Sequence, residues 1–460
     1  MKDLNIALQI LQEAVELTPA DDPDRAFRLQ CVGRSFQDRY YKLGDLKDLE
    51  AMLQNFQDAV DLTPQGQPNR TKYLQNLGIS FSDRYKRLGG LKDLEAALQV
   101  DQEVVDLIPD DDPDRAHCLE HLAISLRDRY QRLGAFEDLT AALEYSQEAL
   151  HLTPQEGPER AGRLQNIAVC YGDRYKRLGD PTDLDLAVQK FEEEIALLPE
   201  DDPSRAAGLQ ILSISVADRY FRLGRLQDLE FALQIDQQVV NLTPEGHSEK
   251  AARLYQLAVS FRDRYQRLCH LKDLEAALQN CKKAVDLTPE GHIDRARQLH
   301  TLAMCFRDRY QTLGDLHDLE NALPRFQQVV DVTPVGNPER AGYLQSLSIT
   351  FTDRYMRFGE LSDLQDALQN DLLALDLTPE DHPDRAGRLQ SVAMSLRYRY
   401  RRLGELKDLE VALKRFQDAV NYTPLEHHDR AERLHNLAVS LRDRYNRFGD
   451  MKDLDAALHH

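Results

Sequence analysis

Apolar and polar positions along the chain recur with a period of 45 residues, and ten copies of this repeat fill almost all of its 460 residues. In the second copy, Leu49, Leu53 and Phe56 recur at the spacing of one face of an α-helix. Each copy opens with an Asp, such as Asp48, which is a favourable N-cap residue. A proline such as Pro64 follows in every copy, and proline cannot continue a helix. We therefore predict a first helix between the Asp and the proline.

A second helix is predicted after the polar loop that follows this proline. In seven copies the loop holds another proline, and Asp or Asn precedes it in several, as Asp22 precedes Pro23. This pair is typical of an N-cap with proline at the first helical position. The helix should end at the Gly of an RLG motif, because glycine readily adopts the left-handed conformation of a C-cap. Cys269 replaces this Gly in one copy.

The second helix is apolar on more than one side. In the third copy Leu119, Ala123, Leu126 and Tyr130 alternate at steps of four, three and four, and Leu122 widens the apolar surface. A helix that is buried on two sides needs two neighbours, which a solenoid of stacked hairpins provides. We therefore predict an all-α solenoid over residues 1–460. Its repeats would start near residues 3, 48, 93, 138, 183, 228, 273, 318, 363 and 408, with a partial eleventh unit near residue 453.

The repeat resembles the tetratricopeptide (TPR) motif. The matching residues are Leu74, Leu77, Gly78 and Phe81 in one helix, and Met52, Phe56, Ala59 and Pro64 in the other. The usual unit has 34 residues, whereas this one inserts seven after the aromatic residue and four in a loop. The chain is most similar to long fungal TPR arrays that are often joined to CHAT protease domains. The resemblance implies a right-handed superhelix that binds peptides or proteins in a concave groove.

The recurring stretch DRY-x-R-L-G favours an architectural role, because a catalytic group usually acts once per chain. Tyr130 lies in phase with Leu126, so its ring should be buried. Arg39 and its equivalents should lie at the edge of this face, with helix-end carbonyls or a carboxylate of the neighbouring hairpin as partners. Arg25 and its equivalents lie on the same edge, two heptads earlier.

The Asp of this stretch is the candidate for ligand contact. A helical wheel places Asp128 opposite the core, four residues before Arg132. An exposed pair at this spacing stabilises a helix by only about 0.3–0.5 kcal/mol. The TPR resemblance instead implies that the Asp row lines the groove, where it would meet a basic or amide-rich peptide. The two interpretations are compatible.

Variable positions on the same helix supply the other candidate contacts. Two rows of variable residues would set ligand specificity, and a row of arginines would bind a ligand carboxylate. In one copy Tyr398 replaces the Asp within an arginine-rich stretch. The candidate groove contacts are Asp83, Asp128, Asp173, Asp218 and Asp263; His117, His121, Asn166, Gln256, Thr301 and Asn436; and Arg127, Arg262, Arg307, Arg397 and Tyr398.

Composition narrows the possible functions. The net charge of −20 argues against nucleic acid as a general partner, and no apolar run approaches the length of a membrane helix. Six cysteines without a pairing pattern favour a reducing, cytoplasmic location. No phosphate loop, dinucleotide, nucleophile or zinc motif is found, which predicts a protein that is not an enzyme and needs no cofactor. His382, His427, His428 and His435 come closest to a metal cluster, but no carboxylate or thiol completes it.

Three functions remain open at this point. The leading hypothesis is a non-enzymatic scaffold that binds peptide or protein partners. The second hypothesis is that the array regulates an enzyme encoded in the same full-length chain, such as a CHAT-type protease. The third is that it forms filaments by end-to-end stacking. The sequence begins and ends at the same phase of the repeat without polar capping units, so we expect a fragment of a longer protein.

Overall fold

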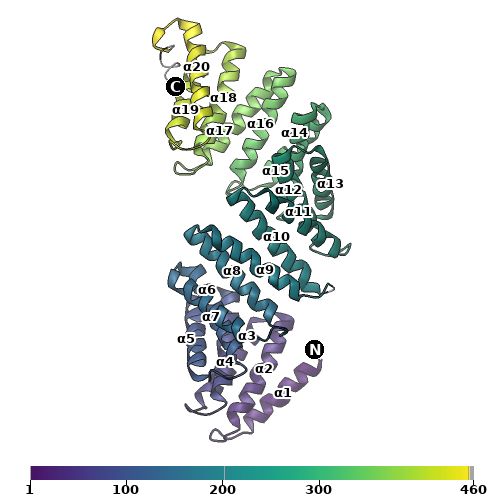
Figure 1. The fold of residues 1–460 in the computed structure, drawn as a ribbon, viewed down its shortest axis with the longest axis vertical. Coiled ribbons are helices and arrows are strands. Elements are labelled where there is room, and N and C mark those ends of the chain that lie inside the picture. The colour runs from purple at the N-terminus through teal and green to yellow at the C-terminus, as the bar shows by residue number, and fades with distance from the viewer. Residues whose placement is uncertain (1, 201, 454, 456–460) are drawn as a thin grey trace. The chain divides into compact units, whose positions relative to one another are not determined.

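The computed structural model describes residues 2–200, 202–453 and 455, and within these residues it consists of twenty helices and no strand (Figure 1). The odd-numbered helices, which are the predicted first helices, are α1 (Lys2–Glu16), α3 (Leu46–Asp61), α5 (Leu91–Leu107), α7 (Phe136–His151), α9 (Pro181–Leu197), α11 (Leu226–Leu242), α13 (Leu271–Leu287), α15 (Leu316–Val332), α17 (Leu361–Asp376) and α19 (Leu406–Asn421). The even-numbered helices are α2 (Arg25–Leu43), α4 (Arg70–Leu88), α6 (Arg115–Leu133), α8 (Arg160–Leu178), α10 (Pro203–Leu223), α12 (Lys250–Leu268), α14 (Arg295–Leu313), α16 (Arg340–Phe358), α18 (Arg385–Leu403) and α20 (Arg430–Phe448). The predicted all-α, TPR-like hairpin repeats are therefore confirmed. Residues 454 and 456–460 of the partial eleventh unit lie outside the described residues.

The helices belong to two compact units, Met1–Ile235 and Asp236–His460. Within each unit an even helix packs against the odd helix that follows it across the RLG turn and against the odd helix that precedes it. Neighbouring even helices also contact each other, as α4 contacts α6 and α14 contacts α16. The even helices thus form a continuous face in each unit, which we call the even-helix face. That all repeats form a single solenoid stays a prediction.

The RLG turn has the predicted left-handed C-cap. Gly44 has a φ of 68°, and its amide donates to the Tyr40 carbonyl at 2.7 Å. Cys269 occupies the same position with a φ of 56°, and it is the one non-glycine residue with positive φ among the described residues. A side chain in this conformation is strained, because its Cβ approaches the backbone. The turn therefore imposes its geometry even where glycine is missing.

Both predicted helix starts need correction. The first helix begins two residues before the Asp that recurs in every copy. Helix α3, for example, starts at Leu46 with Asp45 as its N-cap, so Asp48 lies in the first turn. For the second helix, the predicted Asp–Pro start holds in α10, where Asp202 accepts from the Ser204 amide. Elsewhere a tight turn precedes the helix, which starts two residues later. The loop Asp still accepts an amide there, as Asp22 does, but it caps the turn and not the helix.

The Asp in the first turn has a different task, which is to pair with the Arg of the DRY stretch. Arg39 donates through Nε to Asp48 Oδ2 at 2.8 Å across the RLG turn, and Asp48 is buried. We call this contact the Arg–Asp clamp. The ten clamps are Arg39–Asp48, Arg84–Asp93, Arg129–Asp138, Arg174–Asp183, Arg219–Asp228, Arg264–Asp273, Arg309–Asp318, Arg354–Asp363, Arg399–Asp408 and Arg444–Asp453. The prediction that Arg39 pairs with a carboxylate of the adjoining helix is confirmed.

The second predicted arginine row closes the other end of the odd helices. Arg70 donates to the carbonyls of Val60 and Thr63 at 3.1 and 2.7 Å. These carbonyls lie at and just beyond the end of α3, where few backbone donors remain, and the guanidinium adds to the Thr63 amide that Val60 already accepts at 3.0 Å. Lys250 makes the same two contacts in its repeat. Helix-end carbonyls, which were predicted as one possible partner of the Arg39 row, are thus contacted by this second row.

The core runs between the helices along each unit. Large side chains such as Phe56, Leu119 and Phe326 are fully buried in it. The Tyr of the DRY stretch packs against it with a partly buried ring, as at Tyr40 and Tyr130. None of the described helices is long and apolar enough to cross a membrane.

Candidate functional site

Polar side chains link neighbouring even helices in a regular series along the even-helix face. One residue on an even helix bonds to the residue 46 positions later on the next even helix. We call this series the groove ladder. Its pairs are Gln30–Asn76, Glu120–Asn166, Tyr255–Thr301, His300–Ser346 and Gln345–Ser391, at 2.8, 3.1, 3.2, 2.9 and 2.9 Å. The ladder therefore uses side chains that sequence reasoning assigned to ligand specificity, Asn166 and Thr301 among them.

The Asp row lies in the seams between even helices, so the prediction that it points away from the packed faces is wrong for most members. Asp173 is buried and accepts from Gln131 of the preceding even helix at 3.2 Å. Asp83 accepts from the Tyr41 hydroxyl at 2.8 Å. Burial raises the pKa of Asp263 to about 6 and also raises the pKa of Asp128. Among the described residues, the predicted pairing with the Arg four residues later is not formed at these four positions, and Asp83 and Asp173 pair with other side chains instead.

The basic row does bind carboxylates, but they belong to the protein itself. Arg262 donates to Asp308 at 2.8 Å, and Arg397 donates to Asp443 at 2.9 Å. Arg307 and Arg127 differ, since buried guanidinium nitrogens of both lack a hydrogen-bond partner among the described residues. Burial lowers the pKa of Arg307. Capture of a ligand carboxylate by this row stays a prediction that suits Arg307 and Arg127 best.

The remaining candidates differ from one another in burial and in their neighbours. Asp218 is exposed, and Gln256 and Asn436 are half-buried. Tyr398 is half-buried with its ring centroid 6.4 Å from that of Tyr355 on the neighbouring helix. His117 and His121 are brought together, with their Nε2 atoms 3.2 Å apart. Ligand contact by any of these residues stays a prediction.

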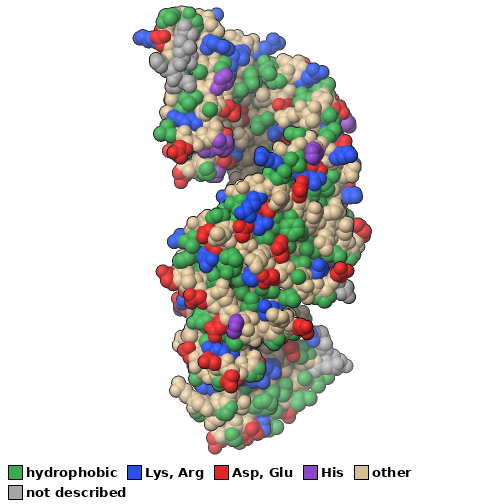
Figure 2. Space-filling view, viewed as in Figure 1, with side chains coloured by type: hydrophobic (Ala, Val, Ile, Leu, Met, Phe, Trp, Pro, Cys, Tyr) green, Lys and Arg blue, Asp and Glu red, His purple; other side chains and the backbone are tan. Residues whose placement is uncertain are grey.

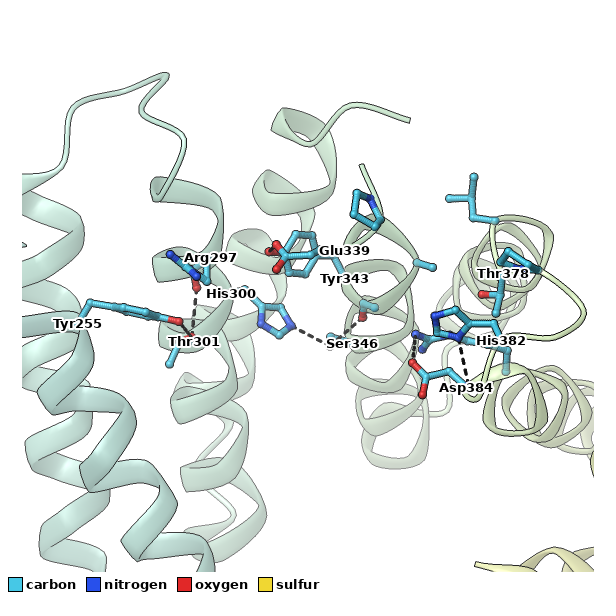
Figure 3. A pocket seen from close by; sticks show the side chains of 16 residues that line it. Tyr255, Arg297, His300, Thr301, Glu339, Tyr343, Ser346, Thr378, His382 and Asp384 are labelled. Carbon is cyan, nitrogen blue, oxygen red and sulfur yellow. Dashed lines mark hydrogen bonds and ion pairs between the residues drawn. The ribbon is translucent and has the colours of Figure 1, made fainter. Parts of the chain in front are cut away.

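A cavity of about 700 Å³ opens on the even-helix face of the second unit (Figure 3). Its walls come from α12, α14, α16, α18 and the loops that lead into α16 and α18. Tyr255, Tyr343 and Leu377 supply apolar surface, and Arg297 lies over the Tyr255 ring with its guanidinium carbon 5.6 Å from the centroid. The other lining residues are His300, Thr301, Pro338, Glu339, Ala341, Gly342, Ser346, Thr378, Pro379, His382, Asp384 and Arg388.

The centre of this cavity is held rigid by aromatic and hydrogen-bonded contacts. The centroids of the His300 and Tyr343 rings are 4.8 Å apart, and His300 Nε2 forms a hydrogen bond with Ser346 Oγ at 2.9 Å. Burial lowers the pKa of His300 to about 4, helped by the nearby charge of Arg262, so the imidazole is neutral at physiological pH. Burial also raises the pKa of Tyr343, whose hydroxyl donates to Glu339 at 2.5 Å. The walls are therefore already ordered without a ligand.

Arg388 is the polar group in this cavity that the protein leaves unsatisfied. In equivalent positions Arg253 and Arg433 donate to the hydroxyls of Thr243 and Thr423 at 2.6 and 2.5 Å. Among the described residues, Arg388 has only an ion pair with Asp384 at 3.5 Å, although just 6% of the residue is exposed. Its buried Nε, like that of Arg253, has no partner among the described residues, and burial lowers the pKa of Arg388. A ligand oxygen at this point would gain a charged hydrogen bond that the protein does not itself use.

Gly342 gives access to this arginine. It occupies a position that is Lys72, His117 or Arg297 in other repeats. A Cβ placed there would meet its nearest atom, Arg388 Nη2, only at 3.9 Å, so the space in front of the guanidinium is open. Any long side chain at this position would fill it.

Sequence reasoning missed most of this site, although a signal was present. The position of Tyr255 and His300 is Gln in six of the ten copies, as at Gln75 and Gln345, and two aromatic rings replace it in successive repeats. The replacements coincide with the cavity. Exceptions within this row were therefore more informative than the variable rows that we chose as candidates.

Charge does not single out any other region of the visible surface. Figure 2 shows acidic, basic and hydrophobic side chains interspersed over that face without a large patch of one kind. A site defined by a cavity is therefore a better candidate than one defined by surface charge.

Comparison with known proteins gives only distant likenesses. No protein-family model matches the chain, and no curated protein matches it. Among solved structures, nearly identical TPR-like repeats from a Podosopora anserina protein described as a kinesin light chain share 19% identity and cover 48% of this chain and 98% of their own, with a TM-score of 0.36. The human IFIT1 dimer with PPP-AAAA shares 17% identity over 94% of this chain and 86% of its own, with a TM-score of 0.45. MamA from Desulfovibrio magneticus RS-1 shares 19% identity and covers 48% of this chain and 96% of its own, with a TM-score of 0.34. Similarities of this size carry no argument about function.

Proposed function

We propose that this protein is a non-enzymatic scaffold that binds a peptide segment of a partner protein at the cavity of its second unit. The observation that carries the proposal is Arg388, a buried arginine without a hydrogen bond among the described residues, which lines the same cavity as the aromatic ring of Tyr343. Ligand cavities in proteins combine an apolar lining with a few polar groups that fix orientation. This cavity has both features.

The chemistry of the cavity indicates an acidic peptide. A carboxylate of the ligand would pair with Arg388, and a neighbouring apolar side chain would rest against Tyr343 and Leu377. The acids that line the cavity are already engaged: Glu339 accepts from Tyr343 at 2.5 Å, and Asp384 pairs with Arg388 at 3.5 Å. A basic peptide would have to compete for these carboxylates, whereas an acidic group adds a partner where one is missing.

Selection of displayed random peptides on the full chain tests the proposal. We expect the enriched peptides to carry an acidic residue close to an apolar one, and fluorescence anisotropy then measures their affinity. Gly342→Arg should abolish binding by filling the cavity. Arg388→Met should weaken it by about tenfold or more, because a hydrogen bond to a charged group contributes about 1.5–3 kcal/mol.

Gly162→Arg is the matched control, since Gly162 holds the same position on α8 in the first unit and a Cβ there meets no atom within 4 Å. Binding that survives Gly342→Arg, or that Gly162→Arg removes equally, would contradict the assignment of the cavity. Circular dichroism of each variant checks that the helices remain intact.

The two other hypotheses, a regulatory array and a filament, use the same scaffold and stay predictions. Light scattering at rising protein concentration tests the filament, which requires growth in mass. The regulatory array requires that peptide binding alters the activity of an enzyme domain joined to the repeats.

A further inference from the structure

Two histidines on the even-helix face of the first unit lie with their ring nitrogens close together. The segment HCLEH places His117 and His121 four residues apart on α6, so their rings project from the same side of the helix. Their Nε2 atoms are 3.2 Å apart, and their ring planes are nearly perpendicular. Two metal–nitrogen bonds of about 2.0–2.1 Å at a tetrahedral angle would hold nitrogens about 3.4 Å apart. The observed separation is close to this value.

We propose that His117 and His121 bind a divalent transition-metal ion, with Zn²⁺ as the representative ion. Two imidazoles favour Zn²⁺, Ni²⁺, Cu²⁺ or Co²⁺ over Mg²⁺, which prefers oxygen ligands. Two protein ligands leave further coordination positions open to water or to a donor from a bound molecule. The proposal does not depend on the peptide cavity, which lies in the other unit.

The surroundings of the pair are compatible with a cation. Both histidines line a cavity of about 220 Å³ together with Cys118 and Asp114 of the same repeat. The charged side chains that line it are Arg34, Lys72, Asp101 and Asp114, so the basic and acidic groups balance.

A second group of potential ligands provides the internal comparison. His427, His428 and Asp429 place three ligand atoms within 4.8 Å of one another, and Asp429 is the carboxylate that sequence reasoning overlooked. This group is less suited to a metal, because Arg433 already pairs with Asp429 at 3.0 Å and His427 Nδ1 accepts the Asp429 amide. It must nevertheless be removed before the first site can be measured alone.

Calorimetric titration of the metal-stripped full chain with Zn²⁺ tests the proposal. The variant His427→Ala/His428→Ala should bind one Zn²⁺, and adding His117→Ala should weaken binding at least tenfold, because one of two ligands is lost. His117 is exposed, so its replacement should leave the fold intact. His435→Ala, at an exposed histidine of another even helix, is the control for loss of a histidine on this face, and Mg²⁺ should give no heat.

Three results would overturn the proposal. They are the absence of Zn²⁺ binding to the parent chain, binding that His427→Ala/His428→Ala abolishes, and binding that His117→Ala leaves unchanged. A Co²⁺ titration gives an independent readout, since its visible absorption should become stronger when histidine nitrogens enter the coordination sphere and should not do so in the His117→Ala variant.

Discussion

Asp101 is a buried carboxylate whose ionisation should lower the stability of the first unit. It is 5% exposed and accepts a hydrogen bond from Ser125 at 2.8 Å. A Cβ at Gly78 on the neighbouring helix would lie 2.4 Å from Asp101 Oδ1, so the carboxylate fills the space that this glycine leaves. Burial raises the pKa of Asp101 to about 6. Asp236 and Asp371 occupy the same position in later repeats, three repeats apart.

The sign of the pH effect follows from this pKa. Because the folded-state pKa of Asp101 lies above its unfolded value, the folded protein favours the protonated form, and stability falls as pH rises through about 6. A shift of about two units corresponds to about 3 kcal/mol once both states are ionised. Most of that loss develops between pH 4 and pH 7.

Asp101→Asn should remove this penalty while keeping an acceptor for Ser125. We expect the variant to gain about 1–1.5 kcal/mol of unfolding free energy relative to the parent between pH 5 and pH 8. Denaturant unfolding followed by circular dichroism at several pH values measures the difference. Asp111→Asn, in an exposed loop, is the control and should show none. A difference that stays constant across this pH range would refute the reasoning.

Three further predictions concern contacts within the repeats. Asp318→Leu should cost about 3–5 kcal/mol by leaving Arg309 without its clamp partner, and Arg309→Met/Asp318→Leu should recover part of the loss in a double-mutant cycle. Cys269→Gly should raise the melting temperature, because it relieves a left-handed backbone conformation that costs a residue with a side chain about 1 kcal/mol. A lower melting temperature would contradict this. Arg307→Met should be neutral or stabilising, since two of its buried nitrogens are unsatisfied, whereas Arg262→Met should destabilise by leaving Asp308 unpaired. Equal losses for these last two variants in denaturant unfolding would count against the distinction.

Features fixed within one hairpin were predictable from the sequence. The period, the helix ends at proline and glycine, and the carboxylate partner of residues such as Arg39 depend on a few neighbouring residues. The helix start was misread because an Asp in the first turn and an Asp at the N-cap have similar sequence contexts. Asp48 was therefore taken for the cap, although Asp45 caps α3 and Asp48 holds Arg39.

Contacts between successive even helices could not be predicted, because they depend on how far one helix is displaced along the next. A helical wheel places Asp173 opposite its own core but gives no information about Gln131 of the neighbouring repeat. The offset of 46 residues in the groove ladder appears only when the helices are in place. The approach of His117 to His121 is different, since both lie on one helix and the spacing alone could have indicated it.

Pairing between even helices also explains why an unsatisfied group is the better candidate for binding. A ligand that reaches Arg262 must first break its bond to Asp308, so the net gain is small. A ligand that reaches Arg388 breaks no internal hydrogen bond and satisfies a guanidinium that is already buried. The desolvation cost of that arginine is included in the stability of the free protein and does not have to be met on binding. Arg occupies the position of Arg388 in five repeats and Gly that of Gly342 in three, so specificity rests on their combination with the rings of Tyr255 and His300, which only two successive repeats supply beside this cavity.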